Sequence, residues 1–215
     1  MTKGEFLKSE LLKGLNVKLK DFGFKLNKSS GEFTKKNKDG WYKYQVVFLN
    51  RNGGWELKPS LLLRFDIVED IFHKTSGFEE RYKKGTPTIG TSIEDYQTDN
   101  NDYRFYLTDE NQIDAIEQNL FLLFKKIALP FYEKFNSLEK VDKALNIDLE
   151  DTSLTGDIFK GSKSLIVAKL IGRDNYKELE DFYLQYYKEF ANGFYFPDFK
   201  KLTEFLEGFN INSTK

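Results

Sequence analysis

Few side chains in this sequence of 215 residues have the type and spacing that catalysis requires. His73 is its one histidine, and cysteine is absent. Sites that need two imidazoles or a thiolate are thereby excluded, as are disulfides and zinc sites built on sulfur. His73 could act as the base for a serine nucleophile, but no Gly-x-Ser-x-Gly segment occurs, and Phe72 beside it belongs to the end of an expected helix. An ordinary surface or helix-end histidine is the favoured interpretation, and the sequence predicts no catalytic residue.

Two segments are rich in carboxylates, whose oxygens suit calcium. The first carries Glu94, Asp95, Asp99 and Asp102, and the second carries Asp148, Glu150, Asp151 and Asp157. Neither matches the spacing D-x-[DN]-x-[DN]-G-x₅-E of a calcium loop, which favours solvated loops. Residues 156–163 contain glycine, serine and lysine but place Ser162 before Lys163, the reverse of the order in a P-loop. The sequence therefore predicts neither a metal ion nor a cofactor.

Basic and aromatic side chains alternate between residues 35 and 44, a pattern typical of surfaces on which nucleic-acid bases stack. Arginine is scarce in the chain, however, although it dominates base recognition. The strand face of Tyr42 and Tyr44 also continues into Val46 and Phe48, which indicates core packing. Nucleic acid is therefore an unfavoured partner.

The formal net charge of −1 hides an uneven distribution along the chain. Residues 1–60 carry 13 basic and 6 acidic side chains, a net charge of +7, and the remaining residues carry a net charge of −8. The basic third could bind a polyanion, or it could attract the acidic part within one fold. The second interpretation is favoured.

The spacing of apolar residues predicts an α+β protein, in which an N-terminal helix packs on a curved antiparallel sheet of about six strands and a mostly helical C-terminal part follows. The first helix should cover residues 4–22, and a four-stranded meander should cover residues 24–65, with a strong turn signal at 50–54. Pro59 predicts a bulge or an edge in the fourth strand. Two short strands are expected in 88–94 and 103–108. Residues 1–135 are interpreted as an α+β domain, and residues 136–215 as a helical extension that packs on it and forms one structural unit with it.

Helices and one long loop account for the rest of the chain. Residues 67–74 predict a short helix and residues 75–90 a polar loop. A helix capped near Asp109 should be kinked or ended by Pro130. Further helices are expected at 137–145, 163–171, 174–193 and 197–207. The side chains of the helix over 174–193 that should face inward are Tyr176, Leu179, Phe182, Tyr183, Tyr186 and Phe190.

The order of several short motifs resembles a known family. These motifs are Phe22-Gly23-Phe24-Lys25, Thr88-Ile89-Gly90, Thr108-Asp109-Glu110 and Ala128-Leu129-Pro130-Phe131. Over roughly residues 5–145 this order resembles the bacterial domain-of-unknown-function family 4304. The resemblance implies an α+β fold and carries no catalytic residue.

Three hypotheses for function follow. The leading one is a non-catalytic domain that binds another protein, for example an immunity-like protein that blocks a toxin, because tyrosine and tryptophan suit protein interfaces. The alternative is a small-molecule-binding or hydrolytic domain with a pocket between sheet and helices, built from Arg64, His73, Arg81 and the loop of Asp95. The third is polyanion binding through the basic N-terminal third. The candidate binding residues are Trp41, Tyr42, Tyr44, Trp55, Arg64, His73, Phe78, Arg81 and Tyr82.

Hydropathy gives no reason to expect a membrane protein. The start of the sequence has no apolar run of the signal-peptide kind, and the apolar runs fall far short of the ~20 residues that span a bilayer. The sequence therefore predicts a cytoplasmic protein with no membrane partner.

Overall fold

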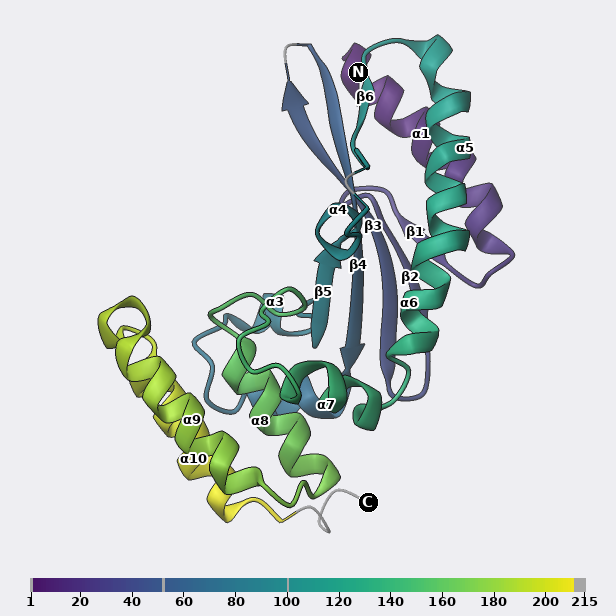
Figure 1. The fold of residues 1–215 in the computed structure, drawn as a ribbon. Helices are drawn as coiled ribbons and strands as arrows, with labels where there is room; N and C mark the ends of the chain where they lie inside the picture. The colour runs from purple at the N-terminus through teal and green to yellow at the C-terminus, as the bar shows by residue number, and fades with distance from the viewer. Residues whose placement is uncertain (1, 52, 100, 211–215) are drawn as a thin grey trace. The chain divides into compact units, whose positions relative to one another are not determined.

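The computed structural model describes residues 2–51, 53–99 and 101–210 and has the predicted α+β architecture (Figure 1). The chain forms two compact units. The first unit consists of Met1–Leu63 and Ile89–Lys134, and the second unit consists of Arg64–Thr88 and Phe135–Lys215. Residues 64–88 therefore group with the C-terminal residues, although they lie between strands of the sheet in the sequence.

The first unit is built around an antiparallel sheet of six strands, as predicted. Its strands are β1 (Lys25–Asn27), β2 (Glu32–Lys36), β3 (Gly40–Arg51), β4 (Gly54–Phe65), β5 (Ile89–Ser92) and β6 (Phe105–Leu107). The strand order is β1-β2-β3-β4-β5, and β6 pairs with β4 as well. The predicted turn at residues 50–54 joins β3 to β4, with Asn52 outside the described residues.

Pro59 lies where β4 changes partner. Residues 55–57 of β4 pair with β6, and residues 60–63 pair with β5. Because proline has no backbone N–H to donate, a gap between two partner strands accommodates it without an unsatisfied ladder position. The strand itself continues through Pro59.

Helices of the first unit cover this sheet. They are α1 (Lys3–Lys20), α4 (Ile93–Tyr96), the 3₁₀ turn η1 (Glu110–Gln112), α5 (Ile113–Leu123), the π-helical segment η2 (Phe124–Ala128) and α6 (Leu129–Lys134). α1 and α5 run side by side (Figure 1), and a Cβ atom on Gly14 would collide with the Glu117 carboxylate. The helix continues beyond Pro130 as α6, and the π-helical segment η2 ends two residues before this proline.

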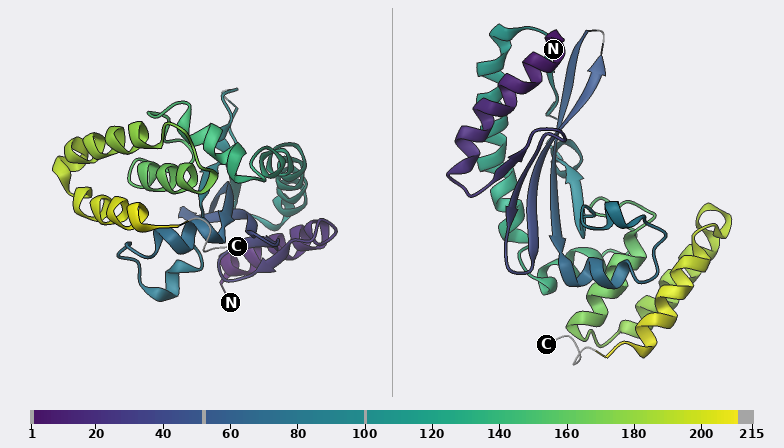
Figure 2. Two further views of the ribbon diagram at one scale, coloured as in Figure 1. Left: turned by 90° about the horizontal axis from the view of Figure 1, so that it is seen from below. Right: turned by 180° about the vertical axis from the view of Figure 1, so that it is seen from behind.

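The second unit is helical. Its helices are α2 (Asp66–Phe72), α3 (Glu80–Lys83), α7 (Leu138–Asn146), α8 (Lys160–Ile171), α9 (Tyr176–Glu189), the 3₁₀ turn η3 (Phe190–Gly193) and α10 (Phe196–Gly208). Residues 160–168 of α8 are all buried, because α2, α7, α9 and α10 all pack against this helix (Figure 2). Gly172 ends α8 in the left-handed conformation that glycine favours, with φ 70°.

One expectation for α9 is wrong. Phe182 was expected to face inward, but its side chain is 37% exposed. The buried line of α9 runs through Leu179, Tyr183 and Tyr187, which are four residues apart. Phe182 lies about 100° around the helix from Tyr183 and therefore falls outside that line.

Among the described residues, none of the helices combines the length and the apolar character that crossing a bilayer requires.

Candidate functional site

Two candidate tyrosines of the first unit have structural roles. Tyr44 is fully buried, and its hydroxyl donates a hydrogen bond to the Leu120 carbonyl at 3.0 Å. Burial raises the pKa of Tyr44 far above its ordinary value. Tyr42 is partly exposed and stacks on Tyr132 with ring centroids 5.0 Å apart. Tyr44 is therefore closed to a partner at the surface.

The two tryptophans also pack within the first unit. Trp41 is only 8% exposed, and the Lys43 ammonium lies 4.4 Å from its ring centroid. The Trp55 indole N–H donates to the Gly4 carbonyl at 2.8 Å and so ties β4 to the first turn of α1. These contacts account for both side chains without a ligand.

The other five candidates all belong to the second unit. Arg64 is buried, and its Nη1 donates to the carbonyl oxygens of Lys83 and Thr86, at 2.8 and 2.9 Å. It thereby fastens the loop that follows α3. Arg81 and Tyr82 are exposed on α3, and Phe78 is half-buried in the loop before it.

A buried ion pair lies behind this loop. The Lys163 ammonium from α8 lies 2.5 Å from both carboxylate oxygens of Glu69 in α2, and neither side chain is more than 3% exposed. The hydroxyls of Thr86 and Thr88 donate to the same carboxylate at 2.7 and 3.1 Å. Burial lowers the pKa of Lys163 to about 8, against the opposing effect of the Glu69 charge. The carboxylate is thus fully partnered, as a buried charge requires.

His73 connects this pair to Ser76 through Thr86. Its Nε2 lies 2.8 Å from the Thr86 hydroxyl, and its Nδ1 lies 2.7 Å from the Ser76 hydroxyl. The Thr86 hydroxyl is placed to donate its proton to groups that can only accept, the Glu69 carboxylate at 2.7 Å and the Lys83 carbonyl at 3.0 Å. His73 Nε2 must therefore carry the imidazole proton and donate to Thr86. Nδ1 is left as an acceptor for the Ser76 hydroxyl.

The imidazole that accepts from the Ser76 hydroxyl is neutral, but it is a weak base. Burial, followed by the charges of Lys163 and Arg64, lowers the pKa of His73 to about 4. A general base works best when its pKa lies near the working pH, and a pKa near 4 falls well below neutrality. A protonated His73 would also lie close to the positive charges of Lys163 and Arg64, which disfavour it. We therefore interpret the hydrogen-bonded series of side chains from Ser76 to Lys163 as a structural support for the loop, since it fixes the position of Ser76.

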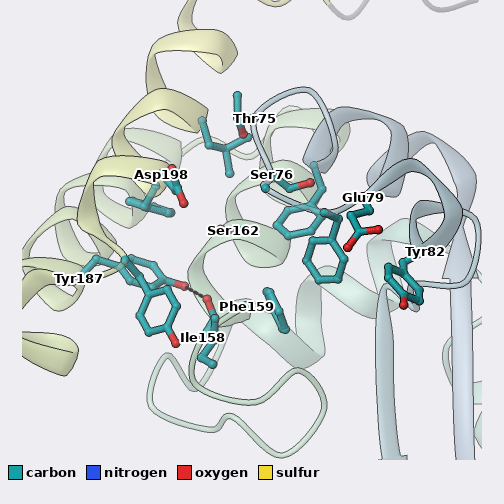
Figure 3. A pocket seen from close by; sticks show the side chains of 15 residues that line it. Thr75, Ser76, Glu79, Tyr82, Ile158, Phe159, Ser162, Tyr187 and Asp198 are labelled. Carbon is teal, nitrogen blue, oxygen red and sulfur yellow. Dashed lines mark hydrogen bonds between the residues drawn. The ribbon is translucent and has the colours of Figure 1, made fainter.

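A pocket of about 470 Å³ opens beside this loop (Figure 3). Its walls come from the end of α2, the loop with α3, the start of α8, α9 and α10. The lining residues are Phe72, Thr75, Ser76, Gly77, Phe78, Glu79, Tyr82, Ile158, Phe159, Ser162, Tyr187, Tyr195, Asp198, Phe199 and Leu202. All of them belong to the second unit. We call this cavity the aromatic pocket, because seven of these side chains are aromatic.

Tyr187 anchors the wall of the aromatic pocket. Its hydroxyl donates to the Ile158 carbonyl at 2.8 Å and accepts from the Gly161 N–H at 3.2 Å. Burial raises the pKa of Tyr187 well above its ordinary value. Gly161 permits this approach, because a Cβ atom there would lie 2.6 Å from the ring of Tyr187.

The structure brings only some of the predicted residues to one place. Phe78 and Tyr82 line the aromatic pocket, and His73 lies one hydrogen bond behind it through Ser76. Arg64 lies farther back, at Thr86. Asp95, expected in the same site, belongs to the first unit, where it lies 3.5 Å from Lys58. The lining residues come from helices and loops, whereas a pocket between sheet and helices was expected.

Sequence reasoning missed the ion pair and most of the pocket wall. Lys163 begins a largely apolar segment that was expected to be a helix, and a lysine there is a signal for a buried partner. Its partner Glu69 lies 94 residues away in the sequence, and no local spacing reveals such a pair.

Comparisons of the chain with protein-family models, with curated proteins and with solved structures found no match.

Proposed function

We propose that the second unit binds a small molecule with an apolar body in the aromatic pocket. The cavity itself carries this proposal, since its volume of about 470 Å³ falls in the range of pockets that hold small ligands. Its wall also has the composition of such sites, which combine many apolar side chains with a few polar groups. Here the polar groups include the hydroxyls of Ser76 and Ser162.

A fragment screen on the full chain tests this function. Ligand-observed NMR would detect binding of small aromatic fragments to the wild type. A Thr75→Trp variant should abolish it, because Thr75 lines the cavity and a large side chain there would fill it. Lys74→Trp is the matched control, since Lys74 is exposed and does not line the pocket. The proposal fails if no fragment binds the wild type, or if fragments bind Thr75→Trp equally well.

Protein binding and polyanion binding remain predictions. Burial of Trp41 and Tyr44 removes two of the side chains that favoured a protein interface. Co-purification of a partner from the native host would support protein binding, and salt-dependent retention on DNA would support polyanion binding. The resemblance to family 4304 also remains a prediction.

A further inference from the structure

We infer that the ligand of the aromatic pocket is an organic cation, an amine or quaternary ammonium group on an apolar body. The inference rests on the proposed function and adds the charge of the ligand to it.

The charged residues that line the aromatic pocket are acidic. Glu79 and Asp198 both line the aromatic pocket, and among the lining residues in the described part of the chain there is no lysine or arginine. In the view of Figure 3, Asp198 on α10 lies on one side of the cavity, and Glu79 and Tyr82 lie on the other. An anionic ligand would meet two like charges there, and a cation would meet two opposite charges.

Both carboxylates remain available to such a ligand. Glu79 pairs with Arg81 at 2.9 Å, and Asp198 pairs with Lys201 at 3.0 Å. All four side chains are more than 60% exposed. Exposed pairs of this kind are weak, because water screens them and holding two long side chains costs entropy. A ligand cation can therefore take the place of either partner.

Aromatic rings of this wall already hold cations of the chain itself. The Arg81 guanidinium lies 4.6 Å from the Tyr82 ring centroid while it pairs with Glu79. The Lys163 ammonium lies 3.8 Å from the Phe72 ring centroid. Both distances fall within the range of cation–π attraction. Arg81 thus shows how a carboxylate and a ring at the rim hold a cation together, and it competes with any ligand for the same two groups.

The test uses three probes of nearly equal shape: 2-phenylethylammonium, 2-phenylethanol and phenylacetate. Dissociation constants would be measured by NMR titration of the full chain. We expect the cation to bind about tenfold more tightly than the neutral alcohol and the anion to bind most weakly. Benzyltrimethylammonium should bind as well, because its charge needs no hydrogen bond.

Four variants separate the contributions. Glu79→Gln and Asp198→Asn should each weaken binding of the cation about two- to fivefold, and weaken it more than they weaken binding of the alcohol. Arg81→Ala should tighten binding of the cation, because it removes the competitor. Asp181→Asn is the control, an exposed carboxylate of α9 that does not line the pocket.

Each other outcome overturns the inference in a recognisable way. Equal binding of cation and alcohol would make the site a neutral apolar pocket, and the proposed function would stand without its charge preference. Tightest binding of phenylacetate, or weaker binding of the cation to Arg81→Ala, would contradict the inference directly. Failure of all three probes and of the fragment screen would remove the proposed function as well.

Discussion

The ion pair between Glu69 and Lys163 makes the most direct prediction about the second unit. A Lys163→Met variant replaces the ammonium with an apolar group of similar length. Among the described residues, the fully buried Glu69 carboxylate then keeps the hydroxyls of Thr86 and Thr88 and, 3.9 Å away, the neutral imidazole of His73. Removal of one member of a buried pair costs about 3–5 kcal/mol, since it leaves a charge without compensation. We expect the free energy of unfolding of Lys163→Met to fall by an amount in that range.

A second substitution tests whether the unpaired charge of Glu69 causes this loss of stability. Glu69→Gln in the Lys163→Met background removes the charge and keeps a similar shape. Replacing both members of a buried pair is often close to neutral, so the double variant should recover most of the lost stability.

Urea unfolding followed by two signals provides the assay. Far-UV circular dichroism reports on helices, most of which belong to the second unit, whereas tryptophan fluorescence reports on the first unit, which contains both Trp41 and Trp55. A loss confined to the dichroism transition would locate the effect in the second unit. The reasoning would be refuted by a loss below about 1 kcal/mol for Lys163→Met, or by a double variant as unstable as the single one.

Three further predictions concern other buried groups. The pKa of His73 is about 4 in the folded chain and about 6.5 when unfolded, so the unfolded state takes up the proton first as the pH falls. The free energy of unfolding of the wild type should therefore fall by about 3 kcal/mol from pH 6.5 to 4, relative to His73→Gln. Urea unfolding of both proteins across that range measures the difference. Gly161→Ala should cost about 1–3 kcal/mol in thermal unfolding because of its contact with Tyr187, although alanine is the better helix former. Gly208→Ala should cost nothing, because a Cβ atom there would have no described atom of another part of the chain within 4 Å. Tyr44→Phe should cost about 0.5–1.5 kcal/mol in the fluorescence-detected transition, and a neutral result would show that the buried hydroxyl is dispensable.

Periodicity predicted most of the fold because it acts locally. The leucines of α1, the alternation along β3 and the turn after it predicted the elements and the meander, since each depends on residues close in the sequence. The same reasoning placed Phe182 wrongly, because periodicity gives the centre of the apolar face of a helix but not its width. Only the packing of neighbouring helices decides which residues at the border of that face are buried. Tyr44 was assigned both to a core face and to a candidate surface, and its burial shows that the core face was the better guide.

The aromatic pocket was beyond sequence reasoning for a different reason. Its wall joins residues 72–82 to residues 158–202, and contacts over such separations depend on how α2, α8, α9 and α10 pack. The sequence by itself determined the element types, the lack of cysteine and the single histidine, because composition and periodicity are properties of the chain alone. Tertiary structure decided that Lys163 finds Glu69, that His73 is held neutral, and that aromatic and acidic side chains surround one cavity. These are consequences of distance and burial in three dimensions.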